Sequence, residues 1–151
     1  MLIMHSKGEP KVAHLDQQWP DVMAELRRFF REKMALAETA GLSADHLVLD
    51  PGIDFAKQRE DNLTILREAE QLQEHGCPVL LPVSRKTVIG EVLGLERPAE
   101  RDAGTVACIA AGVARGAQIF RVHDVTAAWQ AVTVLEAVER GGIGLAKAAA
   151  G

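Results

Sequence analysis

The sequence predicts an α/β protein made of four consecutive βα units. Four short apolar runs of strand length recur at spacings of roughly 30 to 45 residues. A helical pattern follows three of the runs directly, and the other is followed by a loop that leads into a helical pattern. Buried parallel strands read as apolar runs, and βα repeats form parallel sheets with right-handed crossovers. Each run ends in reactive polar residues, which predicts a site at the C-terminal ends of the strands.

The first two units show this pattern clearly. We expect a strand at 2–5 and, after a loop at 6–19, a helix between Pro20 and Gly41, since proline suits a first helical turn and glycine the position after a helix. Apolar side chains recur there at helical spacing: Val22, Leu26, Phe29, Phe30, Met34 and Ala37. The second unit is expected to contain a strand at 46–49, a loop over Pro51 to Phe55, and a helix at 60–75 before Gly76.

The last two units follow the same order of apolar run, polar strand end and helix. The third is expected to contain a strand at 78–83, a short helix at 87–93 and a longer helix at 99–115 before Gly116. The fourth is expected to contain a strand at 117–122 and a helix at 126–139 that stops at Gly141-Gly142. The small residues of 143–151 predict a frayed tail, and nothing in the chain suggests a linker between domains.

Composition sets limits on the class of protein. A chain of 151 residues fits one domain, and a net charge of −4 gives no reason to expect a nucleic-acid surface. Cys77 and Cys108 lack metal-ligand spacing and predict free thiols in a reducing compartment. The first residues do not resemble a signal peptide, and no apolar segment reaches the length of a membrane span. We therefore expect a cytoplasmic protein without a membrane partner.

Four βα units are half of a complete barrel, which needs eight units and roughly 250 residues. The chain therefore forms either a small open sheet or half of a barrel with two sheet edges to cover. In a half-barrel, the strands near Leu2 and Ile119 would expose unpaired backbone and apolar side chains, which favours self-association.

Two strand ends carry residues suited to recognition of a small molecule. Asp50, in Asp50-Pro51-Gly52, could accept two parallel hydrogen bonds from the edge of an amino-pyrimidinone ring, although the same tripeptide is also good turn chemistry. The third strand ends in Ser84-Arg85-Lys86-Thr87, where two cations, two hydroxyls and the free N–H groups of a helix start suit an anion or a carbonyl-rich ring. The alternative for this segment is a solvated basic pair.

The fourth strand end suits a phosphate. Strand alternation places Arg121 and His123 on the same face, where they could hold a phosphate group. Asp124 is a good N-cap for the helix that follows. His5, at the end of the first strand, is interpreted as a structural histidine more readily than as a functional one.

These motifs resemble dihydropteroate synthase. The segments His5-Ser6-Lys7-Gly8, Asp50 to Lys57, Ser84-Arg85-Lys86-Thr87 and Arg121 to Val125 fall in the order of the family's fifth to eighth strands. The resemblance covers Leu2 to about Gly141 and implies the C-terminal half of a TIM barrel, with one pterin-binding domain over 1–151. It implies a transferase of folate synthesis that joins hydroxymethyl-dihydropterin pyrophosphate to p-aminobenzoate and releases pyrophosphate, with Mg²⁺ as cofactor.

The resemblance also implies roles for six residues. Asp50 would bind the pterin amino edge and Lys86 its carbonyl side. Arg121 and His123 would hold the pyrophosphate, which makes them catalytic together with Lys86. The p-aminobenzoate would contact Phe55, and its carboxylate would bind Thr87 and the adjacent helix start. No metal ligand is assigned in this chain, because the family's metal-binding Asn lies in the N-terminal half.

Several residues depart from the family pattern. Asp54 and Ala56 replace glycines of the Asp-Pro-Gly loop, Pro82 replaces a glycine near the pterin, and Ser6 replaces a methionine. The family's N-terminal half, with its metal-binding residues and mobile loops, has no counterpart in the sequence, so we expect a homo-oligomer or a complementing half-barrel, and no activity from this chain alone. The alternatives are a non-catalytic pterin-binding half-barrel or remnant, and the pterin domain of a methyltransferase.

Overall fold

Four parallel strands form the centre of the molecule. The computed structural model describes residues 1–8 and 17–139, and the strands are β1 (Leu2–Met4), β2 (Val48–Asp50), β3 (Leu80–Leu81) and β4 (Ile119–Phe120). β1 pairs in parallel with β2, and β3 pairs in parallel with β4. A parallel bridge between Leu49 and Val79 joins the two pairs, so the strands lie side by side in sequence order. This order confirms the predicted parallel βα repeats.

The hydrogen-bonded strands are shorter than the apolar runs that predict them. Pro78 and Pro82 flank β3. Proline has no N–H and cannot donate to a strand ladder, which limits the pairing on both sides of β3. The pairing nevertheless extends one residue before β3 and one before β4, since the N–H groups of Gln118 and Ile119 both donate to the carbonyl of Val79.

Helices separate the strands along the chain. The α-helices are α1 (Val22–Thr39), α2 (Arg59–Arg67), α3 (Thr87–Leu93), α4 (Asp102–Ala114) and α5 (Val125–Glu139). Three 3₁₀ helices lie between them: η1 (Ala44–His46), η2 (Ala69–His75) and η3 (Pro98–Arg101). The helix expected at 60–75 is therefore two helices, since the backbone leaves helical geometry at Glu68, with φ −120°. The expected stop at Gly141-Gly142, the tail at 143–151 and most of the loop at 6–19 lie outside the described residues.

The first helix illustrates how the local sequence sets an element. The Asp21 carboxylate accepts the N–H of Ala24 at 2.8 Å and caps the N-terminus of α1, and Gly41 follows its end with φ +85°. The face that packs on the strands contains Leu26 and Phe30, which are fully buried. The helical spacing of apolar residues therefore placed this face correctly.

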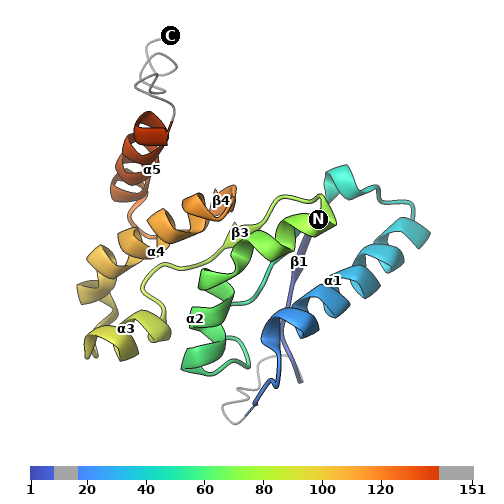
Figure 1. Cartoon of the computed structure of the whole chain (residues 1–151), viewed down its shortest axis with the longest axis horizontal. Coiled ribbons are helices and arrows are strands. Elements are labelled where there is room, and N and C mark those ends of the chain that lie inside the picture. The colour runs from blue at the N-terminus through green and yellow to red at the C-terminus, as the bar shows by residue number, and fades with distance from the viewer. Residues whose placement is uncertain (9–16, 140–151) are drawn as a thin grey trace.

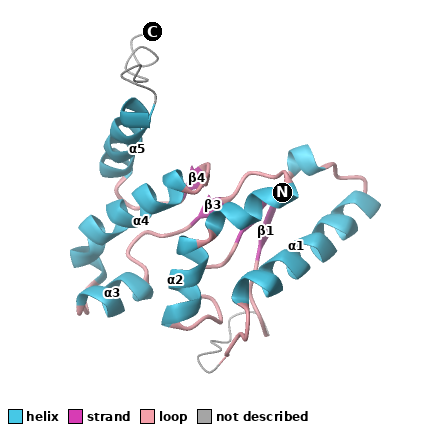
Figure 2. Ribbon diagram, in the orientation of Figure 1, coloured by secondary structure: helices cyan, strands magenta, loops and turns pink. Residues whose placement is uncertain are grey.

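The core lies between the strands and the covering helices. Figures 1 and 2 show β1, β3 and β4 in sequence across the molecule, with α1 beside β1 and α4 beside β4. Leu49 in β2, and Val79 and Leu81 in the segment that contains β3, are completely buried. α5 packs on α4 and extends away from the strands (Figure 1). None of the helices in the described ranges is both long and apolar enough to span a membrane.

Both outer strands expose apolar side chains. Leu2 in β1 is 51% exposed and Ile119 in β4 is 36% exposed. On α5, Trp129 and Val138 are exposed as well. Exposed apolar side chains on the two outer strands are what a half-barrel predicts.

Candidate functional site

The polar strand ends meet at one end of the sheet. The N–H of His5, after β1, donates to the carbonyl of Asp50 at the end of β2, at 2.9 Å. Lys86, after β3, donates from Nζ to a backbone carbonyl in the loop after β2, at 2.8 Å. The side chains of Ser84 and His123, after β3 and β4, lie 2.8 Å apart. The four strand ends identified from the sequence are thus linked by hydrogen bonds from one to the next.

Asp50 is a buried carboxylate surrounded by cations. Its side-chain Oδ1 accepts the N–H of Gly52 at 2.7 Å, which is the turn chemistry of the Asp-Pro-Gly segment. Burial raises the pKa of Asp50, and the positive charges of Lys86, Lys57 and Arg121 oppose that rise. The hydrogen bond from Gly52 and these cations favour the charged carboxylate, but they offset only part of the effect of burial, so the pKa stays above its ordinary value.

Lys57 lies beneath this loop, a role that the sequence did not indicate. Its Nζ is 2.9 Å from Nδ1 of His5 and donates to the carbonyls of Gly52 and Phe55 at 3.1 and 3.0 Å. Burial lowers the pKa of Lys57 to about 8. Burial and then the Lys57 charge lower the pKa of His5 to about 4. His5 is therefore a neutral structural residue at pH 7, as its lone position suggested. The sequence signal that could have identified Lys57 is its place in the same eight-residue motif as Asp50, which runs from Asp50 to Lys57.

The two cations after β3 point in different directions. Arg85 adopts left-handed backbone geometry, with φ +57°, and binds Asp102 through two hydrogen bonds of 2.7 and 2.9 Å. Lys86 lies over the ring of Phe55, with Nζ 4.7 Å from the ring centroid, and burial lowers the pKa of its amine. The expectation that both cations face the site is wrong: Arg85 instead supports the loop against α4.

Asp54 occupies the start of α3. Its carboxylate accepts the N–H groups of Thr87 and Val88 at 2.5 and 3.3 Å, and Asn62 hydrogen bonds to both its backbone and its side chain. The prediction of free N–H groups at this helix start is therefore wrong. Asp54 and Ala56, which replace family glycines, keep the left-handed geometry that glycine favours, with φ +67° and +50°.

Arg121 and His123 follow β4, and both are exposed. The N–H of Arg121 donates to the carbonyl of Leu81 at 3.4 Å, which continues the β3–β4 pairing to the site. Asp124 caps α5 as predicted, since its carboxylate accepts the N–H of Ala127 at 2.9 Å. The cap fixes the chain direction immediately after His123.

Arg101 supports the loop after β3, and the sequence did not indicate this either. Its guanidinium is buried and makes five hydrogen bonds to backbone carbonyls: those of Arg85, Lys86, Leu95 and Glu96. Gly90 lies against it, because a Cβ there would be 2.5 Å from the guanidinium. Arg101 therefore fixes the backbone that carries Lys86.

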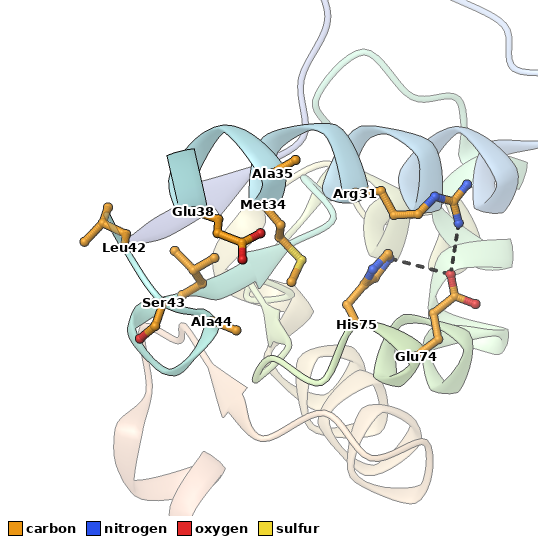
Figure 3. Close-up of a pocket in the computed structure, with 10 residues that line it drawn as sticks. Arg31, Met34, Ala35, Glu38, Leu42, Ser43, Ala44, Glu74 and His75 are labelled. Atoms are coloured by element: carbon orange, nitrogen blue, oxygen red, sulfur yellow. Dashed lines mark hydrogen bonds and ion pairs between the residues drawn. The ribbon is translucent and has the colours of Figure 1, made fainter. Parts of the chain in front are cut away.

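A separate pocket lies at the other end of the strands. It has a volume of about 530 Å³, and the 3₁₀ helices that precede β2 and β3 contribute to its walls (Figure 3). Its lining residues are Arg31, Met34, Ala35, Glu38, Leu42, Ser43, Ala44, Leu47, Glu74 and His75. Side chains at the N-terminal ends of the strands serve stability more often than chemistry, so we place the functional site at the C-terminal ends instead.

Comparison with known proteins shows the family to which the chain belongs. Residues 1–123 match the family described as Pterin binding enzyme. The dihydropteroate synthase of Synechocystis sp. is 39% identical over 140 residues, which are 93% of this chain and 48% of that protein. The solved dihydropteroate synthase of Stenotrophomonas maltophilia superposes with a TM-score of 0.89 at 40% identity, over 91% of this chain and 52% of that one.

The solved dihydropteroate synthase of Xanthomonas albilineans gives a similar result, with a TM-score of 0.84 at 42% identity over 91% of this chain and 48% of that one. The chain thus spans about half the length of the relatives it matches, and its fold is half of their TIM barrel.

Proposed function

Since the chain belongs to the family of pterin-binding enzymes, we propose that it supplies the C-terminal half of a dihydropteroate synthase site. That enzyme would condense 6-hydroxymethyl-7,8-dihydropterin pyrophosphate with p-aminobenzoate in folate synthesis. One observation carries the proposal: Asp50, Lys86, Arg121 and His123 gather at the C-terminal ends of three adjacent parallel strands, β2, β3 and β4.

Asp50 and Lys86 would bind the pterin from two sides. A carboxylate accepts two parallel hydrogen bonds from the amino and ring N–H groups of the pterin, which fixes the plane of the ring. Lys86 is close enough to contact the loop after β2 and would donate to the pterin carbonyl. Its amine lies over the ring of Phe55, so the donor and the aromatic wall lie side by side. These contacts orient the pterin for loss of its pyrophosphate.

Arg121 and His123 would hold the pyrophosphate. When the bond to pyrophosphate breaks, negative charge grows on the leaving group and positive charge on the pterin methylene. Fixed donors at the leaving group stabilise that charge and lower the barrier. Among the residues that the structure describes, no cluster of three or more His, Cys, Asp or Glu side chains could hold a metal ion. The Mg²⁺ that the resemblance implies would neutralise charge on the pyrophosphate oxygens.

The second substrate would bind beside Phe55 and Thr87. The related enzyme of Xanthomonas albilineans has been crystallised with 4-aminobenzoic acid and with 7,8-dihydropteroate. In this chain the Asp54 carboxylate already accepts the N–H of Thr87, so a substrate carboxylate would have to displace it. This contact favours one alternative, a half-barrel that binds a pterin without using p-aminobenzoate.

The rest of the site would come from another half-barrel. An N-terminal half, on the same polypeptide or on a separate chain, or a second copy of this chain would cover the apolar side chains of β1 and β4 and supply the remaining contacts. The exposure of Leu2 and Ile119 supports this proposal.

Titration of the chain with hydroxymethyl-dihydropterin pyrophosphate, with and without Mg²⁺, tests the proposal. We expect saturable binding that Asp50→Ala and Lys86→Ala each abolish, and that Lys33→Ala, a lysine change on α1, leaves unchanged. Absence of binding to the folded chain would refute a preformed half-site.

Addition of an N-terminal half from a relative then tests turnover. Release of pyrophosphate that depends on p-aminobenzoate supports the synthase. Pterin binding without such release supports the non-catalytic alternative.

A further inference from the structure

A serine hydroxyl joins the ends of β3 and β4. Ser84 Oγ lies 2.8 Å from Nδ1 of His123 and accepts the backbone N–H of the same residue at 3.1 Å. Ser84 is buried, whereas His123 is exposed. One hydroxyl therefore holds both the backbone and the ring of His123, and it determines which ring nitrogen faces the protein.

The position of the protons follows from these two contacts. A serine hydroxyl has one proton to donate and two lone pairs that accept. In residues 1–8 and 17–139, both hydrogen bonds of Ser84 Oγ are with His123. The backbone N–H uses one lone pair, and Nδ1 is the acceptor available to the hydroxyl proton. If Nδ1 carried the ring proton instead, the buried hydroxyl would have no acceptor in these residues, which is unfavourable.

We propose that Ser84 is a positioning residue that holds neutral His123 with its proton on Nε2, so that Nε2 donates a hydrogen bond to an anionic oxygen bound at the strand ends. In this arrangement Nε2, across the ring from Ser84, is an N–H donor on an exposed ring. The other tautomer would present a lone pair to the anion and repel it. The proposed function enters only in the identity of the anion, a pyrophosphate oxygen beside Arg121.

The tautomer can be measured on the chain as it is. Histidine labelled with ¹⁵N in the ring gives different ¹⁵N shifts for protonated and unprotonated nitrogens. Spectra are recorded at increasing pH until the ring shifts no longer change, which gives the signals of the neutral ring. His123→Gln assigns the signals. We expect one tautomer in the wild type, with Nε2 protonated, and a mixture of both in Ser84→Ala. Ser84→Thr, which keeps the hydroxyl, should restore the single tautomer.

A binding measurement links the tautomer to the anion. With inorganic pyrophosphate as the probe, Ser84→Ala should weaken binding about tenfold, as expected for one misdirected donor, and Ser84→Thr should recover it. A protonated Nδ1 in the wild type, or identical ring spectra in wild type and Ser84→Ala, would overturn the proposal. The expected tautomers without any pyrophosphate binding would support the role of Ser84 and refute the proposed pyrophosphate site.

Discussion

Replacing Arg101 by lysine should strongly destabilise the fold while keeping the charge. The guanidinium makes five hydrogen bonds of 2.7 to 3.3 Å, and the residue is only 8% exposed. A lysine ammonium can donate three bonds and lacks the planar fork, so at least two charged bonds are lost and a cation remains buried. At about 1.5 to 3 kcal/mol for each of the two charged bonds, we expect a loss of about 3 to 6 kcal/mol in the free energy of unfolding.

Urea unfolding followed by far-ultraviolet circular dichroism measures this loss. Arg97→Lys is the matched control, because Arg97 is 80% exposed and pairs with Glu100 on the surface. Exposed ion pairs contribute at most about 1 kcal/mol, so the control should match the wild type closely. An Arg101→Lys variant within about 1 kcal/mol of the wild type would show that the carbonyl contacts do not hold the loop as described.

Three further changes test other contacts. Gly52→Ala should prevent folding or cost several kcal/mol, because its Cβ would overlap the carbonyl oxygen of His5. Gly41→Ala, at φ +85° in open space, should cost only about 1 to 2 kcal/mol, and equal losses of the two variants in urea unfolding would contradict this expectation. The pKa of His5 is lowered from 6.5 to about 4, so between these pH values the unfolded chain binds a proton that the folded chain does not. The free energy of unfolding should therefore fall as the pH falls from 6.5 to 4, by at most about 3 kcal/mol. His5→Asn should not show this fall, and parallel pH profiles of the two proteins would refute the reasoning. Asp54→Gly and Asp54→Ala both remove the carboxylate that caps α3, but only glycine accepts φ +67° without strain. The glycine variant should therefore be more stable than the alanine variant by about 1 kcal/mol in thermal unfolding, and the opposite order would contradict strain at this position.

Support for the site comes largely from residues that touch no proposed ligand. Arg101 holds the carbonyls of the loop that carries Lys86, and Thr105 accepts the N–H of Arg85 at 3.0 Å. Lys57 performs the corresponding role for the loop after β2. Both loops are thus fixed by buried cations that donate to backbone carbonyls. Changes at these positions would displace the site without removing any group that binds.

The sequence alone determined the elements that depend on local pattern. Apolar runs and helical spacing predicted four parallel strands in order, and glycine and Asp124 predicted helix ends, because these signals come from neighbouring residues. Pro20, predicted in the first turn of a helix, instead precedes the cap Asp21. Polar residues at strand ends predicted where the site lies, since parallel strands bring their C-terminal ends to one edge. The helix predicted at 60–75 is divided at Glu68 into an α-helix and a 3₁₀ helix, and the apolar spacing does not detect this change in backbone geometry.

Only the tertiary structure decided which of these polar groups face the site. Arg85 and Lys86 are adjacent cations, and their opposite directions follow from φ +57° at Arg85 and from Asp102 on another helix. Likewise, Asp54 reaches the start of α3 across a gap of more than thirty residues in the chain. These outcomes depend on contacts between loops from different βα units, and no local pattern in the sequence encodes the distance between two loops.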